Sequence, residues 1–336
     1  MFSQLYSPKK LDELDYNNEL TNILKNIVKN GINQNLLYSG IRNTGKKTRI
    51  KCLLNDIYGN IKSSIQTTTI GKNLEIIYKS NQYYYELSPS DYGVHDKSIL
   101  SEFIYPLALS SNVLTNQKKI FIILYIDRLS LKAQYILRNI IEKSYKTSWF
   151  ICTCYDSSKI LYSLLNKFMI LRNSNPSVND VTNILNNISK KNNYKISSRS
   201  INNIINSSKN IDGNINLLHS LNILQMSYID NKYNKYSNKF IYLIDKLIIE
   251  IDKSDKKLKN ISNIREGILL IYISNINMIN VFQYILNYYL MKKYDNPIKF
   301  AILDKAEKYS YLMTKGNKIP LYLESFILNI INILHE

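Results

Sequence analysis

The stretch Gly40–Lys46 consists of Gly-Ile-Arg-Asn-Thr-Gly-Lys and fits the first seven positions of a phosphate-binding loop, G-x-x-x-x-G-K. The glycines let backbone N–H groups turn inward around phosphates, and the lysine adds a positive charge. The loop follows the apolar run Asn35–Ser39 and precedes Thr48–Tyr58, whose apolar residues recur at helical spacing. A strand, this loop and a helix in that order predict a nucleotide-binding P-loop domain; a tight strand–helix turn is the alternative.

The eighth position of the motif departs from the pattern. A serine or threonine hydroxyl normally holds Mg²⁺ there, but this chain has Lys47, and Thr48 follows one residue late. A second ammonium group screens phosphate charge but cannot ligate a metal ion, so the pattern argues against a Mg²⁺ site. The residues expected to hold the phosphates of ATP or ADP are Gly40, Thr44, Gly45, Lys46, Lys47 and Thr48.

A P-loop ATPase also needs an acidic residue at the end of a neighbouring strand to hold Mg²⁺, and a carboxylate to activate water. The uninterrupted apolar run Ile120–Ile126 predicts a strand buried on both faces of a parallel sheet, and Asp127 follows it. No second acid follows Asp127. Asp127 is therefore either a metal ligand or a helix-capping or surface aspartate.

The first half of the chain alternates strand-like and helix-like segments. Further strands are predicted at Tyr83–Leu87 and Trp149–Cys154, with a helix at Ser130–Glu142 between them. This alternation predicts an α/β fold with a parallel sheet.

After Arg172 the pattern becomes helical. Residues 173–177 form a turn-rich break in which Ser177 is a plausible helix cap. Further amphipathic helices are expected at Phe240–Ile251, Val281–Leu290 and Leu321–Leu334. We therefore expect a P-loop domain at 1–172, a small helical lid at 173–232 and an all-α domain at 233–336.

Composition restricts the class of protein. The chain has 336 residues, 44 basic and 26 acidic, for a net charge of +18. This charge suggests a nucleic acid or another polyanion as partner, although lysine enrichment from an AT-rich genome is an equal alternative. Three cysteines and three scattered histidines complete no disulfide scaffold or metal site. The longest apolar run is too short to cross a membrane and no secretory signal is evident, so we expect a soluble intracellular protein.

Several segments resemble one family. The loop and following helix, Gly45–Gly59, are similar to the replication factor C small subunit that carries a Gly-Lys-Lys-Thr loop. Glu86–Gly93 is similar as well, and Ala133–Glu142 matches the family's Ala-Gln-x-x-Leu-Arg helix. Tyr6–Pro8 and Tyr309–Leu334 extend the likeness to both ends of the chain.

The resemblance implies an AAA+ ATPase module followed by a lid and a helical collar for oligomerisation. In the family, five such subunits form an open ring that loads the sliding clamp onto primer–template DNA. The implied partners are therefore the other subunits of a hetero-pentamer, the sliding clamp and primer–template DNA, with no membrane.

The resemblance also implies that the catalytic residues are missing. Asp127 matches the fourth position of the family's Asp-Glu-Ala-Asp box, so the two catalytic acids fall on Leu124 and Tyr125. The first-sensor asparagine matches Tyr155. The arginine that reaches into a neighbour's site matches Lys167, and the second-sensor arginine matches Asp212. These replacements predict a subunit that does not hydrolyse ATP itself.

Four basic residues are candidates for contacts with DNA phosphates, each with a solvated surface charge as the alternative. They are Lys97, Arg128, Lys132 and Arg138, of which Arg138 could instead face a neighbouring subunit.

Two other functions compete with the clamp-loader subunit: an active ATPase that uses Asp127, and a stand-alone basic DNA-binding scaffold on a degenerate AAA+ fold. The AT-rich composition and the divergence suggest a fast-evolving or viral lineage. The expected location is the nucleus, or a cytoplasmic viral replication compartment.

Overall fold

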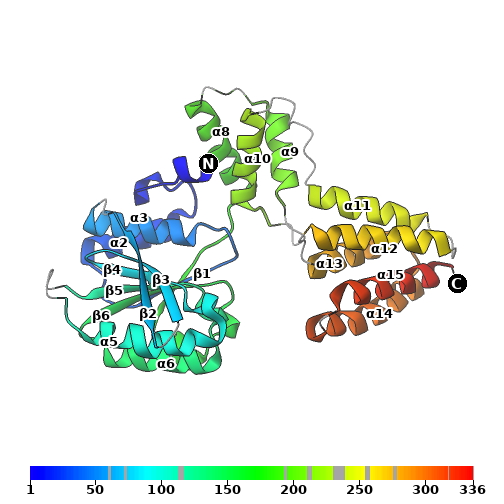
Figure 1. Cartoon of the computed structure of the whole chain (residues 1–336). Helices are drawn as coiled ribbons and strands as arrows, with labels where there is room; N and C mark the ends of the chain where they lie inside the picture. The colour runs from blue at the N-terminus through cyan, green and yellow to red at the C-terminus, as the bar shows by residue number, and fades with distance from the viewer. Residues whose placement is uncertain are drawn as a thin grey trace. The chain divides into compact units, whose positions relative to one another are not determined.

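Two compact units make up the chain in the computed structural model (Figure 1). The first comprises Met1–Ile205 and Ile215–Ile229, and the second comprises Asn206–Asn214 and Asp230–Glu336. The structure describes residues 1–59, 62–71, 74–112, 117–192, 194, 196–209, 214–229, 239–253, 258–274, 278–316 and 318–335.

A seven-stranded sheet in the order β2-β3-β4-β5-β6-β1-β7 forms the centre of the first unit. The strands are β1 (Leu36–Ser39), β2 (Ser64–Ile70), β3 (Leu74–Ser80), β4 (Tyr84–Leu87), β5 (Lys119–Ile123), β6 (Ser148–Cys154) and β7 (Met169–Arg172). The five strands from β4 to β7 in this order are parallel, whereas β2 and β3 join them antiparallel. The expected α/β fold is confirmed, with an antiparallel edge that the sequence did not predict.

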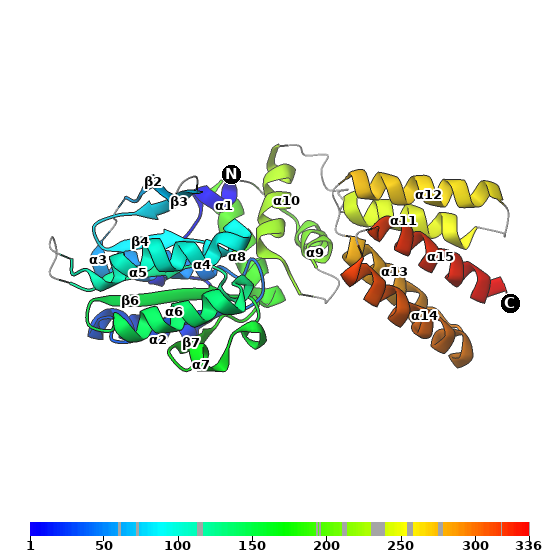
Figure 2. The same cartoon turned by 60° about the horizontal axis from the view of Figure 1, so that its bottom comes forward.

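Helices cover both faces of this sheet (Figures 1 and 2). They are α2 (Asn18–Asn30), α3 (Lys46–Tyr58), α4 (Asp96–Ser98), α5 (Tyr105–Leu109), α6 (Leu131–Lys143) and α7 (Tyr162–Leu165), whereas α1 (Phe2–Leu5) packs against α10 (Leu217–Ile229). Alternate residues of β5 enter two different cores, Ile120 and Ile122 on the α2–α3 side and Phe121 and Ile123 on the α5–α6 side. Strand β5 is therefore buried on both faces, as its apolar run predicted.

The strand predicted at Ile120–Ile126 is three residues too long. Strand β5 ends at Ile123, and a 3₁₀ turn occupies Ile126–Arg128. Tyr125 takes a left-handed conformation with φ 57°, and its N–H donates to the Thr153 hydroxyl at 3.0 Å. The chain turns because this N–H bonds to a side chain, a feature that apolar content does not reveal.

A three-helix lid belongs to the first unit. It consists of α8 (Val178–Lys191), α9 (Ser198–Ser207) and α10 (Leu217–Ile229). The predicted cap Ser177 makes a reciprocal capping box with Asp180 at the start of α8. Tyr16 is buried in the core of the lid, and Phe2 and Tyr6 pack against this core. The N-terminal segment and the lid therefore share one apolar cluster.

The second unit is all helical, as expected. Its helices are α11 (Lys239–Asp252), α12 (Leu258–Ile273), α13 (Met278–Met291), α14 (Asn296–Lys315) and α15 (Ile319–His335). Its core is separate from those of the sheet, with Phe282, Phe326 and Ile302 at its centre. Among the residues described, no helix combines the length and apolarity needed to cross a membrane.

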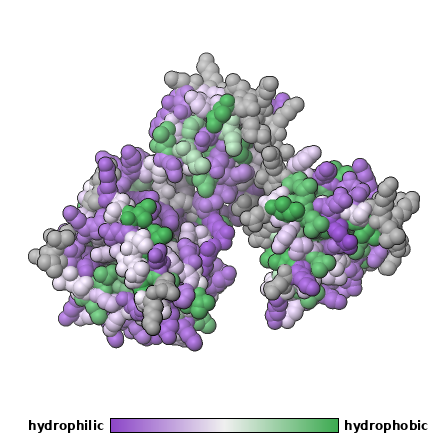
Figure 3. Space-filling view, in the orientation of Figure 1, coloured by the Kyte–Doolittle hydropathy of each residue, from purple (hydrophilic) through white to green (hydrophobic). Residues whose placement is uncertain are grey.

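Hydrophobic side chains also lie on the outside of the second unit. Leu270, Met291 and Phe300 are all exposed, and Figure 3 shows hydrophobic patches on this unit between hydrophilic areas. Exposed apolar patches of this kind are typical of surfaces that other proteins cover.

Candidate nucleotide-binding site

The phosphate loop joins β1 to α3, and its two glycines are required by its geometry. Gly45 lies immediately before α3 with φ 69°, a left-handed conformation that glycine adopts without strain. At Gly40 a Cβ atom would lie 2.5 Å from the Asn173 carbonyl oxygen. The first turn of α3 therefore presents its N–H groups beside the loop, which is the arrangement that binds phosphate.

Lys46 is buried at the start of α3. Its Nζ donates to the carbonyl oxygens of Gly40 at 2.5 Å and Ile41 at 2.7 Å. Loss of hydration by burial lowers the pKa of Lys46 to about 8. The ammonium group is thus held at the loop with its charge only partly compensated, so a phosphate group would stabilise it.

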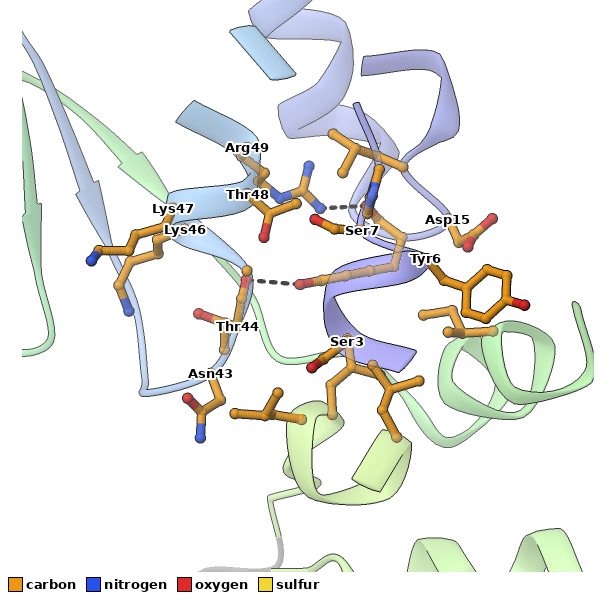
Figure 4. Close-up of a pocket in the computed structure, with 18 of the residues that line it drawn as sticks. Ser3, Tyr6, Ser7, Asp15, Asn43, Thr44, Lys46, Lys47, Thr48 and Arg49 are labelled. Carbon is orange, nitrogen blue, oxygen red and sulfur yellow. Dashed lines mark hydrogen bonds between the residues drawn. The ribbon is translucent and has the colours of Figure 1, made fainter. Parts of the chain in front are cut away.

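A cavity of about 610 Å³ opens next to the loop. Figure 4 shows residues of the loop, among them Thr44 and Lys46, and of the N-terminal segment, among them Ser3 and Tyr6, that line it. Its apolar wall includes Ile184, Ile188, Leu217 and Leu221 from the lid, and its lining also includes Asn43, Thr44, Gly45, Lys46, Lys47, Thr48, Tyr125 and Tyr155. A cavity that is cationic at one end and apolar at the other fits a nucleotide, with the phosphates at the loop and the base against the lid.

Tyr16 fixes the shape of the loop from the N-terminal segment. Its hydroxyl donates to the Thr44 carbonyl at 2.7 Å, and the Asn173 amide donates to the same oxygen at 3.0 Å. Arg49, fully buried in α3, in turn donates to the Tyr16 carbonyl at 2.5 Å and to the Thr21 hydroxyl at 3.0 Å (Figure 4). These positioning residues were not predicted to belong to the site, because only their packing distinguishes them from ordinary tyrosines and arginines.

Two tyrosines occupy the end of the sheet beside the loop. Tyr125 and Tyr155 stack with ring centroids 5.1 Å apart and an interplanar angle of 23°. We call them the tyrosine pair. The Arg128 guanidinium lies 5.2 Å from each ring centroid, and Arg42 and Lys46 lie 5.1 Å and 4.6 Å from the Tyr155 centroid. Burial, together with a hydrogen bond to Tyr125, raises the pKa of Tyr155 to about 12, so the Tyr155 ring is uncharged within this cationic cluster at neutral pH.

Ligands for Mg²⁺ are missing from the described part of this site. Lys47, at the position of the usual hydroxyl, has its Nζ 3.7 Å from a Glu86 carboxylate oxygen. Asp127 is 9% exposed, keeps one buried oxygen without a hydrogen-bond partner, and does not line the cavity. No cluster of three His, Cys, Asp or Glu residues able to hold a metal ion occurs among the described residues. The residues therefore fit a nucleotide but not the metal ion that normally accompanies it.

The four basic candidates for DNA binding lie in three elements. Lys97 in α4, Lys132 in α6 and Arg128 are exposed, and Arg128 also lies over the tyrosine pair. Arg138 in α6 donates to Glu142 at 3.1 Å, which Lys167 also contacts at 2.9 Å. Contact with DNA stays a prediction for all four. Asp212, predicted at the second-sensor position, lies outside the described residues.

Two solved structures have a similar fold. DnaA from Aquifex aeolicus, bound to AMPPCP, is similar with a TM-score of 0.52 and 12% identity, covering 96% of this chain and 97% of DnaA. A RuvB variant from Thermotoga maritima is similar with a TM-score of 0.50 and 15% identity, covering 82% of this chain and 87% of RuvB. The chain therefore has an α/β P-loop fold like that of these proteins, followed by an all-helical C-terminal region.

Sequence relatives carry the assignment further. The human replication factor C subunit 3 is 32% identical over 195 residues. This match covers 55% of this chain and 55% of the human protein, about half the length of each. A probable replication factor C subunit 3 of Dictyostelium discoideum is 27% identical and covers 96% of this chain and 95% of the relative. The Saccharomyces cerevisiae subunit 5 is 26% identical, with 96% of both covered. No protein-family model matches the chain. The chain is thus similar in sequence to replication factor C subunits, the family that its motifs resemble.

Proposed function

We propose that this chain is a clamp-loader subunit that binds ATP or ADP without hydrolysing it, within a hetero-oligomeric ring that loads the sliding clamp onto primer–template DNA. The observation that carries the proposal is the tyrosine pair. It fills the place where the family resemblance puts a catalytic acid and the first sensor. A phenol ring can neither activate water as a carboxylate does nor hold Mg²⁺, while the phosphate loop beside it keeps its lysine.

Two surface properties support assembly and DNA contact. Exposed apolar residues on the helical second unit, among them Leu270 and Phe300, suit packing against neighbouring subunits. The net charge of +18 suits DNA phosphates, with Lys97, Lys132, Arg128 and Arg138 as candidates. Such a subunit would act in the nucleus, or in a cytoplasmic replication compartment if its source is a virus.

Purification of the tagged chain from its native source, with mass spectrometry of stoichiometric partners, tests the proposal. Recovery of other P-loop paralogues, together with the sliding clamp when ATP is added, is the expected result. A monomer without paralogues would overturn the clamp-loader role. It would favour instead a basic DNA-binding scaffold whose affinity for DNA falls steeply with salt and ignores nucleotide.

One observation favours an active ATPase as a second candidate. Asp127 keeps a buried carboxylate oxygen without a partner, a group that a metal ion could satisfy. This alternative requires Mg²⁺-dependent ATP turnover by the purified chain that Asp127→Asn abolishes. Our proposal expects no turnover by either protein in the same assay.

A further inference from the structure

Lys47 occupies the position from which a hydroxyl would hold Mg²⁺, and its own contacts keep it there. Its ammonium nitrogen lies 3.7 Å from Glu86, whose side chain in β4 is only 10% exposed, and 5.7 Å from the ring centroid of Tyr125. Figure 4 shows the Lys46 and Lys47 side chains extending in the same direction from the start of α3. The site therefore offers two lysine charges to a phosphate chain where other P-loop proteins offer a lysine and a metal ion.

The surroundings disfavour a divalent cation. The positions that the resemblance gives to the catalytic acids carry Leu124, buried in the core beside α2 and α3, and Tyr125. The rings of the tyrosine pair are contacted by cations of Arg42, Lys46 and Arg128. A Mg²⁺ ion entering beside them would meet like charges on several sides, and the carboxylate beside this position, Glu86, is already paired with Lys47.

We propose that this chain binds ADP or ATP as the metal-free anion, with the Lys47 ammonium group taking the place of the Mg²⁺ charge. Glu86 orients Lys47 by pairing with it in the absence of ligand. The inference rests on the proposed nucleotide site but not on assembly into a ring. It also explains how the nucleotide can be retained while hydrolysis, which depends on the metal, is lost.

Equilibrium binding of a fluorescent ADP, the N-methylanthraniloyl derivative, to the full-length chain tests this inference. Titrations are made with excess Mg²⁺ and with EDTA. The wild-type dissociation constant should agree within about threefold between the two conditions, because no protein group gains from the metal.

The Lys47→Thr variant restores the hydroxyl and removes the charge. Its affinity in EDTA should fall by about tenfold, the expected effect of losing one charge-assisted contact, and Mg²⁺ should restore most of the loss. Lys51→Thr makes the same change at an exposed position one turn further along α3 and should bind like the wild type. Recovery of binding by Lys47→Thr in Mg²⁺ also shows that this variant is folded.

Three results would overturn the inference: wild-type binding at least about tenfold tighter in Mg²⁺, equal affinities of Lys47→Thr and Lys51→Thr in EDTA, or no binding under either condition. None of them decides the clamp-loader role, which is judged by the co-purified partners.

Discussion

Burial shifts the titration of Lys46 into an accessible pH range. In the folded protein its pKa is about 8, against 10.5 for an ordinary lysine, because the cavity removes water from the ammonium group. Between pH 8 and pH 10.5, Lys46 is therefore mostly deprotonated in the folded protein but still protonated in the unfolded chain. The ligand-free protein should therefore gain stability from this group as the pH rises through 8.

Nucleotide binding should depend on pH in the opposite direction. A phosphate group favours the charged form of Lys46, so binding above pH 8 requires uptake of a proton. Affinity for ADP should be greatest near pH 7, where Lys46 is charged and the terminal phosphate is ionised, and should fall by up to about tenfold per unit above pH 8. Titrations between about pH 6.5 and 9.5 measure this profile.

Lys46→Arg is the control for this profile. The guanidinium group stays protonated throughout the range, so its binding, although weaker, should not change with pH. A wild-type affinity that is the same at pH 7 and pH 9.5 would contradict the assignment of Lys46 as the phosphate-binding lysine with a lowered pKa.

Tyr16→Phe tests the support of the phosphate loop. The change removes the hydroxyl that donates to the Thr44 carbonyl but keeps the ring that lies 4.8 Å from the Arg49 guanidinium. Because Asn173 still donates to the same oxygen, the free energy of unfolding should fall by only about 1 kcal/mol. Denaturant titration measures this change, and ADP affinity should fall with it because the loop loses one of its two fixed donors.

Tyr162→Phe is the matched control, since Tyr162 is 77% exposed and loses the same hydroxyl without a buried partner. Equal effects of the two substitutions would show that the Tyr16 hydroxyl does not support the loop.

At the level of elements, one carboxylate joins α4 to the start of α6. The Asp96 side chain, 2% exposed, accepts from the Ser130 N–H at 2.7 Å and from the Ser130 hydroxyl at 3.1 Å. Ser130 is the residue that caps α6 by accepting from the Ala133 N–H. Two elements that are far apart in the chain are therefore fixed by the same buried group.

Asp96→Ala should lower the free energy of unfolding by about 2–4 kcal/mol, because it leaves a buried N–H unpaired and weakens the cap. Asp91→Ala removes an exposed carboxylate from the preceding 3₁₀ turn and should change stability by less than about 0.5 kcal/mol. Denaturant titrations of the two variants make the comparison, and similar losses would contradict a structural role for Asp96.

The sequence predicted the elements whose apolar residues follow a clear pattern and missed the β2–β3 hairpin, which buries only a few apolar side chains, among them Ile70 and Ile76. Strand β5 was predicted from its uninterrupted apolar run and helix α6 from apolar residues at helical spacing, and the apolar residues of both enter a core. Strands β2 and β3 were not predicted. Residues Ser64–Thr67 are exposed on both faces of β2, and the exposed Ile65 and Ile77 obscure the inward positions of Ile70 and Ile76, so apolar content alone does not mark the hairpin.

Only those residues of the site that belong to a known sequence motif could be predicted. The loop residues Thr44–Thr48 follow a known pattern and line the cavity. Alignment with the family motifs placed Tyr125 and Tyr155 at catalytic positions. Their stacking and their contacts with basic side chains could not be predicted, because they depend on the left-handed conformation of Tyr125 after β5. Tyr16 and Arg49 could not have been assigned, because composition supplies many tyrosines and basic residues and only burial selects these two.

At the scale of the whole molecule, the described part of the nucleotide site lies within one unit. Every residue that lines the cavity belongs to the first unit, including the lid residues Ile184 and Leu221. The helical second unit has its own core, in which Phe326 and Ile330 are fully buried. Each unit therefore has the apolar interior needed to unfold as a cooperative element.

Calorimetry of the full-length chain should accordingly show two transitions. ADP at about 100 times its dissociation constant should stabilise the unit that binds it by about 2.7 kcal/mol and raise that transition by several degrees. The other transition should not move, because ligand binding acts only on the unit whose folded state forms the site.

Phe326→Ala assigns the transitions independently. Removing this ring from the core of the second unit should cost about 3–5 kcal/mol and lower only the transition that ADP leaves unchanged. Cys154→Ala, a smaller deletion at a buried position of the first unit, serves as the reciprocal control and should lower only the ADP-sensitive transition. A single transition that responds to ADP and to both substitutions would show that the two cores unfold as one, and that nucleotide in the first unit stabilises the helices of the second.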